Sequence, residues 1–187
     1  PRLALELIDS KDLFTTYDPD AMAQRLAPLM QSAVKENPDA SMDHQLAHLK
    51  SALRQFRRRE MVRIACRDLA GASDYHQTVK ELSALAEACI VAVVDRLHLL
   101  LAQIWGQPQG PPEAPGDQRL VVLGMGKLGA RELNFSSDID LIFAYPASGN
   151  TAGGQRSLTN DGFFTRLARL VIKALGATTA DGFVFRV

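Results

Sequence analysis

The sequence has few of the features that would narrow its class at once. Its 187 residues include two cysteines, Cys66 and Cys89, only 6% are aromatic, and basic and acidic side chains balance at 21 each. Both cysteines lie in apolar helical patterns, which is typical of buried free thiols in a reducing compartment and not of a disulfide framework. We therefore expect a cytoplasmic protein.

The absence of net charge and of a long apolar run excludes further classes. No overall field would attract polyanions, so a nucleic-acid role would need a local patch. The longest apolar stretch, Cys89 to Leu101, is interrupted by Asp95, Arg96 and His98, so the sequence predicts no membrane span. The opening residues, Pro1 to Glu6, have neither an initiator Met nor a leader pattern. We expect a soluble globular chain cut from a longer protein, with neither a nucleic acid nor a membrane as partner.

The first half of the chain has the pattern of a helical bundle. Its apolar residues recur at three- and four-residue spacing, with few β-branched runs. Ser41 and Asp43 offer caps for a long helix that Gly71 ends. A capping box at Asp74 or Thr78 begins a second helix, which runs to Trp105. This pattern predicts a helical domain over residues 1–106.

The second half changes in composition. Residues 107–116 are rich in Pro and Gly, which predicts a linker, and residues 117–187 form a mixed α and β unit. The fold class is therefore α+β. Within the mixed unit we expect, in order, a buried strand over Leu120–Leu123, a helix over Lys127–Leu133, a buried strand over Ile139–Tyr145, a polar loop over Gly149–Gly154, a helix capped by Asn160 or Asp161 and ended by Gly176, and a strand over Phe183–Val187.

A glycine-rich turn joins the first of these strands to the short helix. Gly124-Met125-Gly126-Lys127-Leu128-Gly129 lets backbone N–H groups approach a phosphate at a helix N-terminus. The spacing also fits the G-x-G-x-x-G pattern of dinucleotide-binding folds. However, only residues 130–137 separate the turn from the next acidic residue, which is too short for a parallel crossover. Dinucleotide binding is therefore the second choice, after a phosphate site.

Two aspartates, Asp138 and Asp140, stand at the entrance of the second strand. Strand alternation would place both carboxylates on one face. Such a pair suits Mg²⁺, which takes one or two carboxylates and completes its shell with water and substrate phosphates. Ser136 and Ser137 precede the pair and would either donate to a phosphate or cap a turn. The pattern favours metal-assisted phosphoryl or nucleotidyl transfer.

Each of these features also has a purely structural interpretation. Glycine permits tight turns without any ligand, and aspartates at a strand entrance are common solvated turn residues. The conjunction of turn, serines and acidic pair favours function. An arginine-rich stretch, Arg54 to Arg67, could meet RNA or an acidic partner, but we interpret it as a solvated helix face. The four histidines show no metal-ligand spacing with the cysteines.

The run from Leu123 to Phe143, LGMGKLGARELNFSSDIDLIF, closely resembles the glutamine synthetase adenylyltransferase and adenylyl-removing family. The segments Phe163–Leu167, Asp181–Val187 and Phe56–Met61 are also similar to this family. The family carries two related domains of the nucleotidyltransferase superfamily, of the DNA polymerase beta type. One domain attaches AMP to a tyrosine of glutamine synthetase, and the other removes it by phosphorolysis to give ADP. Three local sequences are more similar to the amino-terminal, adenylyl-removing half: Phe143–Pro146, the Gly153-Gly154 loop and the strand at Gly182.

The resemblance implies roles for individual residues. Asp138 and Asp140 would hold Mg²⁺ and carry the catalysis, while the nucleotide or phosphate would lie against the following residues: Gly124, Gly126, Lys127, Ser136 and Ser137. The substrates or products would be adenine nucleotide (ATP or ADP) and phosphate. The partners would be glutamine synthetase and the signalling protein PII, in the control of nitrogen assimilation. The family pattern continues with a third aspartate, which would follow Val187.

Overall fold

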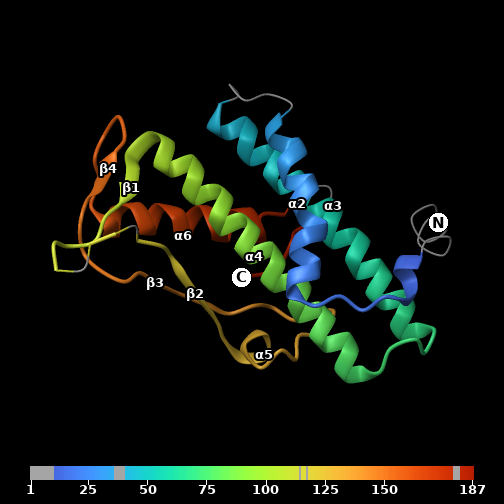
Figure 1. Ribbon diagram of the computed structural model, residues 1–187. Coiled ribbons are helices and arrows are strands. Elements are labelled where there is room, and N and C mark those ends of the chain that lie inside the picture. Colours follow the sequence, from blue (N-terminus) through green and yellow to red (C-terminus); the bar gives the residue numbers. More distant parts are fainter. Residues whose placement is uncertain (1–10, 36–40, 114, 117, 179–181) are drawn as a thin grey trace.

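The computed structural model describes residues 11–35, 41–113, 115–116, 118–178 and 182–187 (Figure 1). Helices dominate and two small sheets accompany them, which confirms the α+β class. In chain order the elements are η1 (Lys11–Phe14), α2 (Pro19–Lys35), α3 (Met42–Leu69), α4 (Tyr75–Trp105), β1 (Gly106–Pro108), β2 (Val121–Gly124), α5 (Gly126–Gly129), β3 (Leu141–Ala144), β4 (Thr151–Gly153) and α6 (Asn160–Gly176).

The two long helices begin and end where the sequence predicts. Ser41 caps α3 through its side chain, and Gly71 follows the helix with a φ of 66°. Asp74 and Gln77 form a reciprocal capping box at the start of α4, which satisfies two of the amide groups that a helix start leaves without intrahelical partners. Gly106, with a φ of 81°, ends α4. Local chemistry therefore sets the boundaries of both helices.

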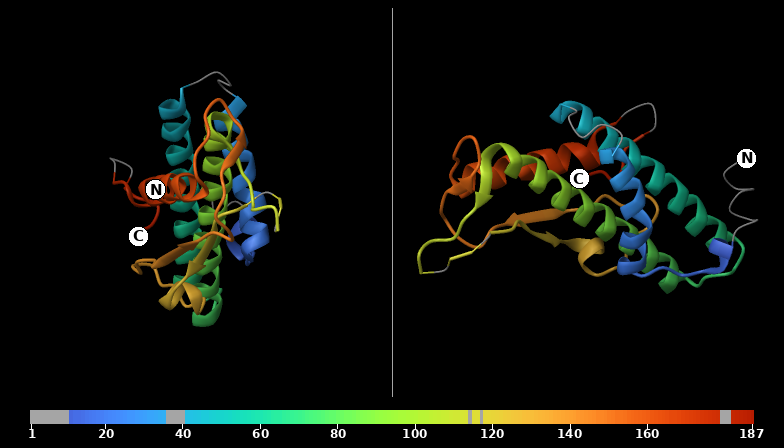
Figure 2. Two further views of the ribbon diagram at one scale, coloured as in Figure 1. Left: turned by 90° about the vertical axis from the view of Figure 1, so that its left-hand side faces the viewer. Right: turned by 45° about the horizontal axis from the view of Figure 1, so that its top comes forward.

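Helix α4 is the centre of the fold. Helices α2, α3 and α6 all pack against it, and the buried side chains of both halves of the chain form one continuous apolar core (Figures 1 and 2). Among the described residues, no helix combines the length and the apolar character that crossing a membrane requires. The division into residues 1–106, 107–116 and 117–187 stays a prediction.

The start of the expected linker and the expected polar loop contain two strands that pair with each other. Strand β1 pairs antiparallel with β4, so Gln107 and Pro108 belong to a sheet and not to an irregular linker, and the expected polar loop over Gly149–Gly154 holds its partner strand. Gly106 and Gly154 permit this pairing, because a Cβ on Gly154 would lie 2.1 Å from the backbone nitrogen of Gly106. Asn160, whose own cap role passes to Thr159, donates from its buried amide to the carbonyls of Gln109 and Ala147. Composition alone could not show these pairings.

Strands β2 and β3 form a separate antiparallel pair, with Val122 opposite Phe143 and Gly124 opposite Leu141. The expectation that both strands are fully buried is wrong. One face of the pair packs toward the core, but on the other face Leu123 and Ile142 are each 49% exposed. Helix α5 is also shorter than the expected 127–133.

The expected final strand over Phe183–Val187 is not formed among the described residues. The amides of Val184 and Phe185 instead donate to the carbonyl of Leu175, at the end of α6. This segment folds back on the helix because Val184 and Phe185 are buried in the core. A single backbone bond, from Ile139 N to the carbonyl of Arg186, joins it to the residues before β3.

The arginine-rich stretch of α3 is not the solvated face that the sequence suggested. Arg54, Arg63 and Arg67 are buried, and only Arg58 and Arg59 are exposed. Glu81 on α4 accepts from Arg63 at 2.6 Å and from Arg67 at 2.9 Å. Because a buried charge is costly unless it is paired, the acidic partners explain how these arginines enter the core. The correction also removes a continuous basic face for RNA.

The ionic cluster extends to the start of the described chain. Glu60 accepts from Arg63 and from Arg25 of α2, and Arg25 also pairs with Asp12 at 2.9 Å. The hydrogen bond from Arg25 holds the pKa of the Asp12 carboxyl well below its ordinary value. The ring of Tyr17 lies against the guanidinium groups of Arg25 and Arg63. Ion pairs therefore fasten η1 and α2 to α3 and α4.

Replacing Glu81 tests the weight of this cluster. Glu81→Gln leaves Arg63 and Arg67 buried without their shared counter-charge, so we expect a loss of about 3–5 kcal/mol in the free energy of unfolding. Glu87→Gln is the matched control on the same helix, since its pair with Arg131 is exposed, and should cost less than about 1 kcal/mol. Urea unfolding measures both variants. Equal losses would contradict the account.

The two cysteines give a second test. Both are free thiols, but Cys89 is fully buried and burial raises its pKa to about 12, whereas Cys66 is partly exposed. Because the thiolate is the reactive form, an aromatic disulfide reagent at pH 8 should react with Cys66 alone in the folded protein and with both thiols in urea. The variant Cys66→Ser should be unreactive until unfolded. Rapid reaction of Cys89 in the folded variant would show that this core is wrongly described.

Candidate functional site

The glycine-rich turn is held by close backbone approach. A Cβ on Gly129 would lie 2.5 Å from the carbonyl oxygen of Gly124, so only glycine allows α5 to fold back onto the end of β2. Gly126 begins α5 with a φ of 53°, in the left-handed region that favours glycine. Leu128 anchors the turn from below, buried in the core. The turn is therefore a rigid feature, and the first-turn amides of α5 have no intrahelical acceptor.

Asp140 lies directly against this turn. Its carbonyl accepts from the amide of Met125 at 2.9 Å, which continues the β2–β3 ladder into the turn. A Cβ placed on Gly126 would lie 3.7 Å from Oδ2 of Asp140, so the carboxylate faces the glycine. The structure thus brings Asp140 and the predicted glycine turn together, although Asp140 follows Gly126 by more than ten residues in the sequence.

Asp138 lies at the same approach to β3 but has a partner of its own. Its carboxylate pairs with Nε of Arg186 at 2.5 Å, and both side chains are more than half exposed. Nη2 of Arg186 also donates to the carbonyl of Ser136 at 2.9 Å. Between the two aspartates, Ile139 is buried at 1% exposure and fixes the backbone. An exposed carboxylate with one exposed cation keeps oxygen lone pairs for another ligand.

The two serines serve a local turn. Ser137 donates from its hydroxyl to Oδ1 of Asn134 at 2.6 Å, and the same hydroxyl accepts from the amide of Asn134. The amide of Ser136 donates to Oδ1 of Asn134 as well. Of the two possibilities left open by the sequence, the turn-capping one is what the structure displays. Lys127 is exposed on α5, at the outer side of the glycine turn.

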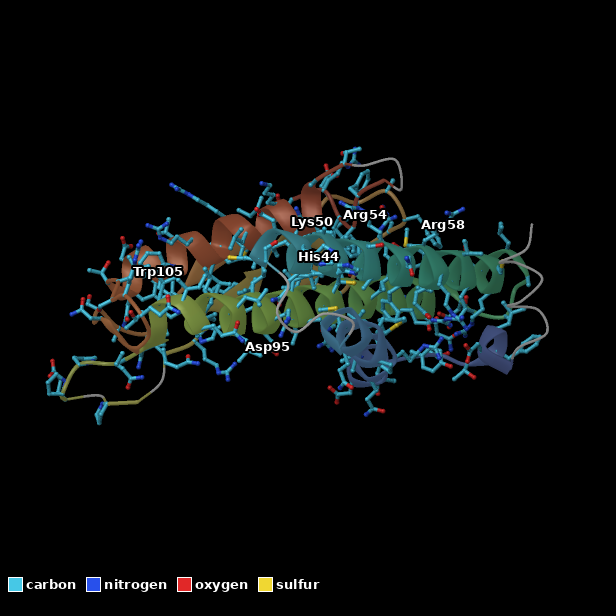
Figure 3. The ribbon with its side chains drawn as sticks, turned by 90° about the horizontal axis from the view of Figure 1, so that it is seen from above. His44, Lys50, Arg54, Arg58, Asp95 and Trp105 are labelled. Carbon is cyan, nitrogen blue, oxygen red and sulfur yellow. The ribbon has the colours of Figure 1, made fainter. Side chains whose placement is uncertain are left out.

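Two arginines of α3 position the segment that carries Arg186. Arg54 donates to the carbonyls of Gly182 at 3.0 Å and Ala177 at 2.9 Å, and the guanidinium of Arg57 lies 5.3 Å from the ring centroid of Phe183. Figure 3 shows Arg54 on the side of α3 that faces the end of α6. Burial lowers the pKa of Arg57. The helical half therefore supports the acidic pair, through Arg186.

Sequence reasoning missed the burial of the arginines of α3, yet a signal for it was present. Arg63 and Arg67 continue, at helical spacing, the buried stripe that Leu53 and Phe56 begin. A charged residue in phase with a core stripe indicates a buried ion pair when an acidic residue occupies the matching phase of a neighbouring helix, as Glu81 does on α4. We interpreted the arginines as one basic run and did not compare their spacing with that of the buried apolar residues of α3.

The donor set suits a hard divalent cation that shares its shell with phosphate. Asp140 offers carboxylate oxygens beside the glycine-rich turn and Asp138 offers them two residues earlier, and oxygen donors are what Mg²⁺ prefers. Among the described residues, no cluster of three or more His, Cys, Asp or Glu side chains could enclose a metal. A site of two carboxylates leaves the remaining positions to water, substrate or further protein ligands, as a magnesium site in phosphoryl transfer requires.

Comparison with known proteins shows the family of this chain. The sequence model of the glutamate-ammonia ligase adenylyltransferase family matches residues 1–187, and the chain belongs to this family. It is 48% identical over 187 residues to the bifunctional glutamine synthetase adenylyltransferase/adenylyl-removing enzyme of Nitrosococcus oceani, and 46% identical over 187 residues to that of Thioalkalivibrio sulfidiphilus. The enzyme of the same name from Pseudomonas aeruginosa is 44% identical over 185 residues. All or nearly all of this chain is covered, but it spans only 18% of each relative.

Gly129 provides a direct test of the turn. Gly129→Ala must push the backbone of Gly124 away, so we expect it to cost about 1–3 kcal/mol in unfolding free energy and to shift the backbone amide resonances of Met125 and Asp140. Gly176→Ala is the control, because its Cβ would make an ordinary 3.8 Å contact. It should change stability by less than about 1 kcal/mol. Urea unfolding and NMR measure both; matching behaviour would show that the turn does not need the glycine.

Proposed function

We propose that this chain forms part of a magnesium-dependent nucleotidyltransferase that removes AMP from an adenylylated tyrosine of glutamine synthetase by phosphorolysis, releasing ADP. One observation carries the proposal: the carboxylate of Asp140 faces Gly126 of the glycine-rich turn. Membership of the family supports glutamine synthetase as the protein acted on. The mixed nucleotidyltransferase core, expected from the resemblance, is part of the same proposal.

The proposed chemistry is largely positioning and charge compensation. When bound, Mg²⁺ would offset negative charge on the phosphoryl oxygens as the bond between AMP and the tyrosine breaks. Asp138 and Asp140 would hold it, while the turn at Gly124–Gly126 and the side chain of Lys127 would orient the phosphates. The Asn134 turn, with Ser136 and Ser137, would fix the approach of the acidic pair to β3. The tyrosine oxygen leaves with the bonding electron pair and takes a proton, and a phosphate oxygen forms the new bond to the AMP phosphorus.

The relatives are named for two opposite activities, and the alternative proposal is the adenylylating one. The local sequence at Phe143–Pro146 and at Gly182 is more similar to the adenylyl-removing half and favours removal of AMP. Control by the PII protein, and a cytoplasmic place in nitrogen regulation, follow from the family resemblance and belong to this proposal. A non-catalytic nucleotide sensor is the remaining candidate, supported by the presence of only two carboxylates at the turn among the described residues.

The acidic pair gives the test of the proposed reaction. The double variant Asp138→Asn and Asp140→Asn, made in the polypeptide at the full length of its relatives, should lose ADP release from adenylylated glutamine synthetase by at least about a thousandfold while keeping its circular dichroism spectrum. Asp20→Asn, which removes an exposed carboxylate from the first turn of α2, should leave the rate unchanged. Unaltered ADP release in the double variant would exclude the assignment.

Calorimetry separates the enzyme from the sensor. Titration of this chain with ADP should show binding that strengthens when Mg²⁺ is present and that the double aspartate variant abolishes, because Asp138 and Asp140 would hold the Mg²⁺ that offsets the phosphate charge. Binding of equal strength with and without Mg²⁺ would instead support a sensor.

A further inference from the structure

Two cavities along α4 join into one open trough. The first, of about 570 Å³, lies between α4 and the β2–α5 region, and the second, of about 490 Å³, lies between α4 and α2. Both are lined by Val91 and Asp95, so they meet on one face of the helix. Figure 3 shows Asp95 on the side of α4 that is turned away from α6. The trough therefore lies on the side of α4 opposite α6.

The floor of the trough carries exposed apolar residues between the charged side chains of Glu87, Asp95 and Arg96. Val91 is 55% exposed and Leu99 is 50% exposed, while the faces of α4 toward α3 and α6 are fully buried. Single exposed apolar residues are ordinary, but these two share the trough with further apolar groups of both walls.

The wall formed by α2 favours a helix as the covering element. Ala23 and Ala27 recur at a spacing of four residues, and Ala88 and Ala92 repeat that spacing on α4. Small side chains at this spacing let another helix approach closely, with ridges entering the groove between α2 and α4. Apolar grooves of this kind are recognised by amphipathic helices that present residues at positions i, i+4 and i+7.

The other wall needs support of its own. The β2–β3 pair has strands of four residues each, and Val122 and Leu141 line the cavity that separates the pair from α4. A two-stranded sheet is marginal in water unless further strands or a helix cover it. Its opposite face is apolar as well, at Val121 and Ile142, and strands that are apolar on both faces are typical of sheets buried on both sides.

The extent of the match indicates where the covering helix comes from. The chain is 44–48% identical to its relatives along its whole length, yet it spans only 18% of each of them. A large apolar trough suits a permanent contact, because a soluble protein would otherwise expose it whenever a transient partner left. A helix from elsewhere in the same polypeptide meets that condition at all times.

From these observations we propose that the trough between α2, α4 and the β2–β3 pair is a docking site for an amphipathic helix supplied by the same polypeptide outside these 187 residues. The helix would place its apolar stripe on Val91 and Leu99. It would also support the β2–β3 pair from behind, and so the turn that faces Asp140. The proposal does not depend on the reaction that the site performs.

Thiol labelling in the polypeptide at the full length of its relatives tests the docking site. Val91→Cys and Leu99→Cys are made separately in a background without other reactive thiols, with Cys66 replaced by Ser. Ile172→Cys, on α6 and 41% exposed, and Leu69→Cys, 87% exposed, are the controls outside the trough. We expect maleimide to label the two trough positions at least about tenfold more slowly than the controls.

The same variants in the 187-residue chain complete the design, and there the trough positions should be labelled as fast as Ile172→Cys. Equal labelling of trough and control positions at full length would overturn the proposal. Protection that appears in the 187-residue chain and rises with its concentration would also overturn it, since the occupant would then be a second copy. If the shorter chain does not fold, the comparison within the full-length protein still decides.

Discussion

The antiparallel pairing of β2 with β3 is the constraint on which the candidate site depends. Its ladder runs one step beyond the strands, to the bond between the amide of Met125 and the carbonyl of Asp140. That bond sets the glycine turn beside an aspartate that follows it by more than ten residues. A one-residue slip in register would move every side chain of β3 to the opposite face and separate the carboxylate from Gly126. The position of the Asp140 carboxylate beside the glycine turn therefore depends on the register of this short ladder.

The ladder is supported from two directions. Helix α3 reaches it through the C-terminal segment, because Arg54 and Arg57 hold the residues around Phe183 and Arg186 contacts Asp138. Helix α4 lies behind it but across a cavity, which is why a covering helix is expected there. The buried ion pairs of Glu81 on α4 with Arg63 and Arg67 fix α3 and α4 relative to each other. Ionic contacts in the helical half thus act on the geometry of the acidic pair.

Sequence analysis succeeded where local chemistry decides the structure. The caps at Ser41 and Asp74, and the positive φ of Gly71 and Gly106, fixed the long helices, and the short spacing after Gly129 correctly argued against a parallel crossover. It failed where distant partners decide. The pairing of β1 with β4, the fold-back of Val184 onto Leu175 and the burial of Arg63 all require residues far apart in sequence. For the site, the pattern located the turn and the acidic pair, but it could not indicate the ion pair of Asp138.

The central claim is that Asp138 and Asp140 gather a divalent cation beside the glycine turn. Paramagnetic broadening by Mn²⁺ tests it most directly, because Mn²⁺ accepts the same oxygen ligands as Mg²⁺. The account predicts that low Mn²⁺ concentrations selectively broaden the amide resonances of Gly126, Lys127 and the residues from Asp138 to Asp140, and that excess Mg²⁺ restores them. Broadening centred on other carboxylates, with these resonances unaffected, would contradict the account.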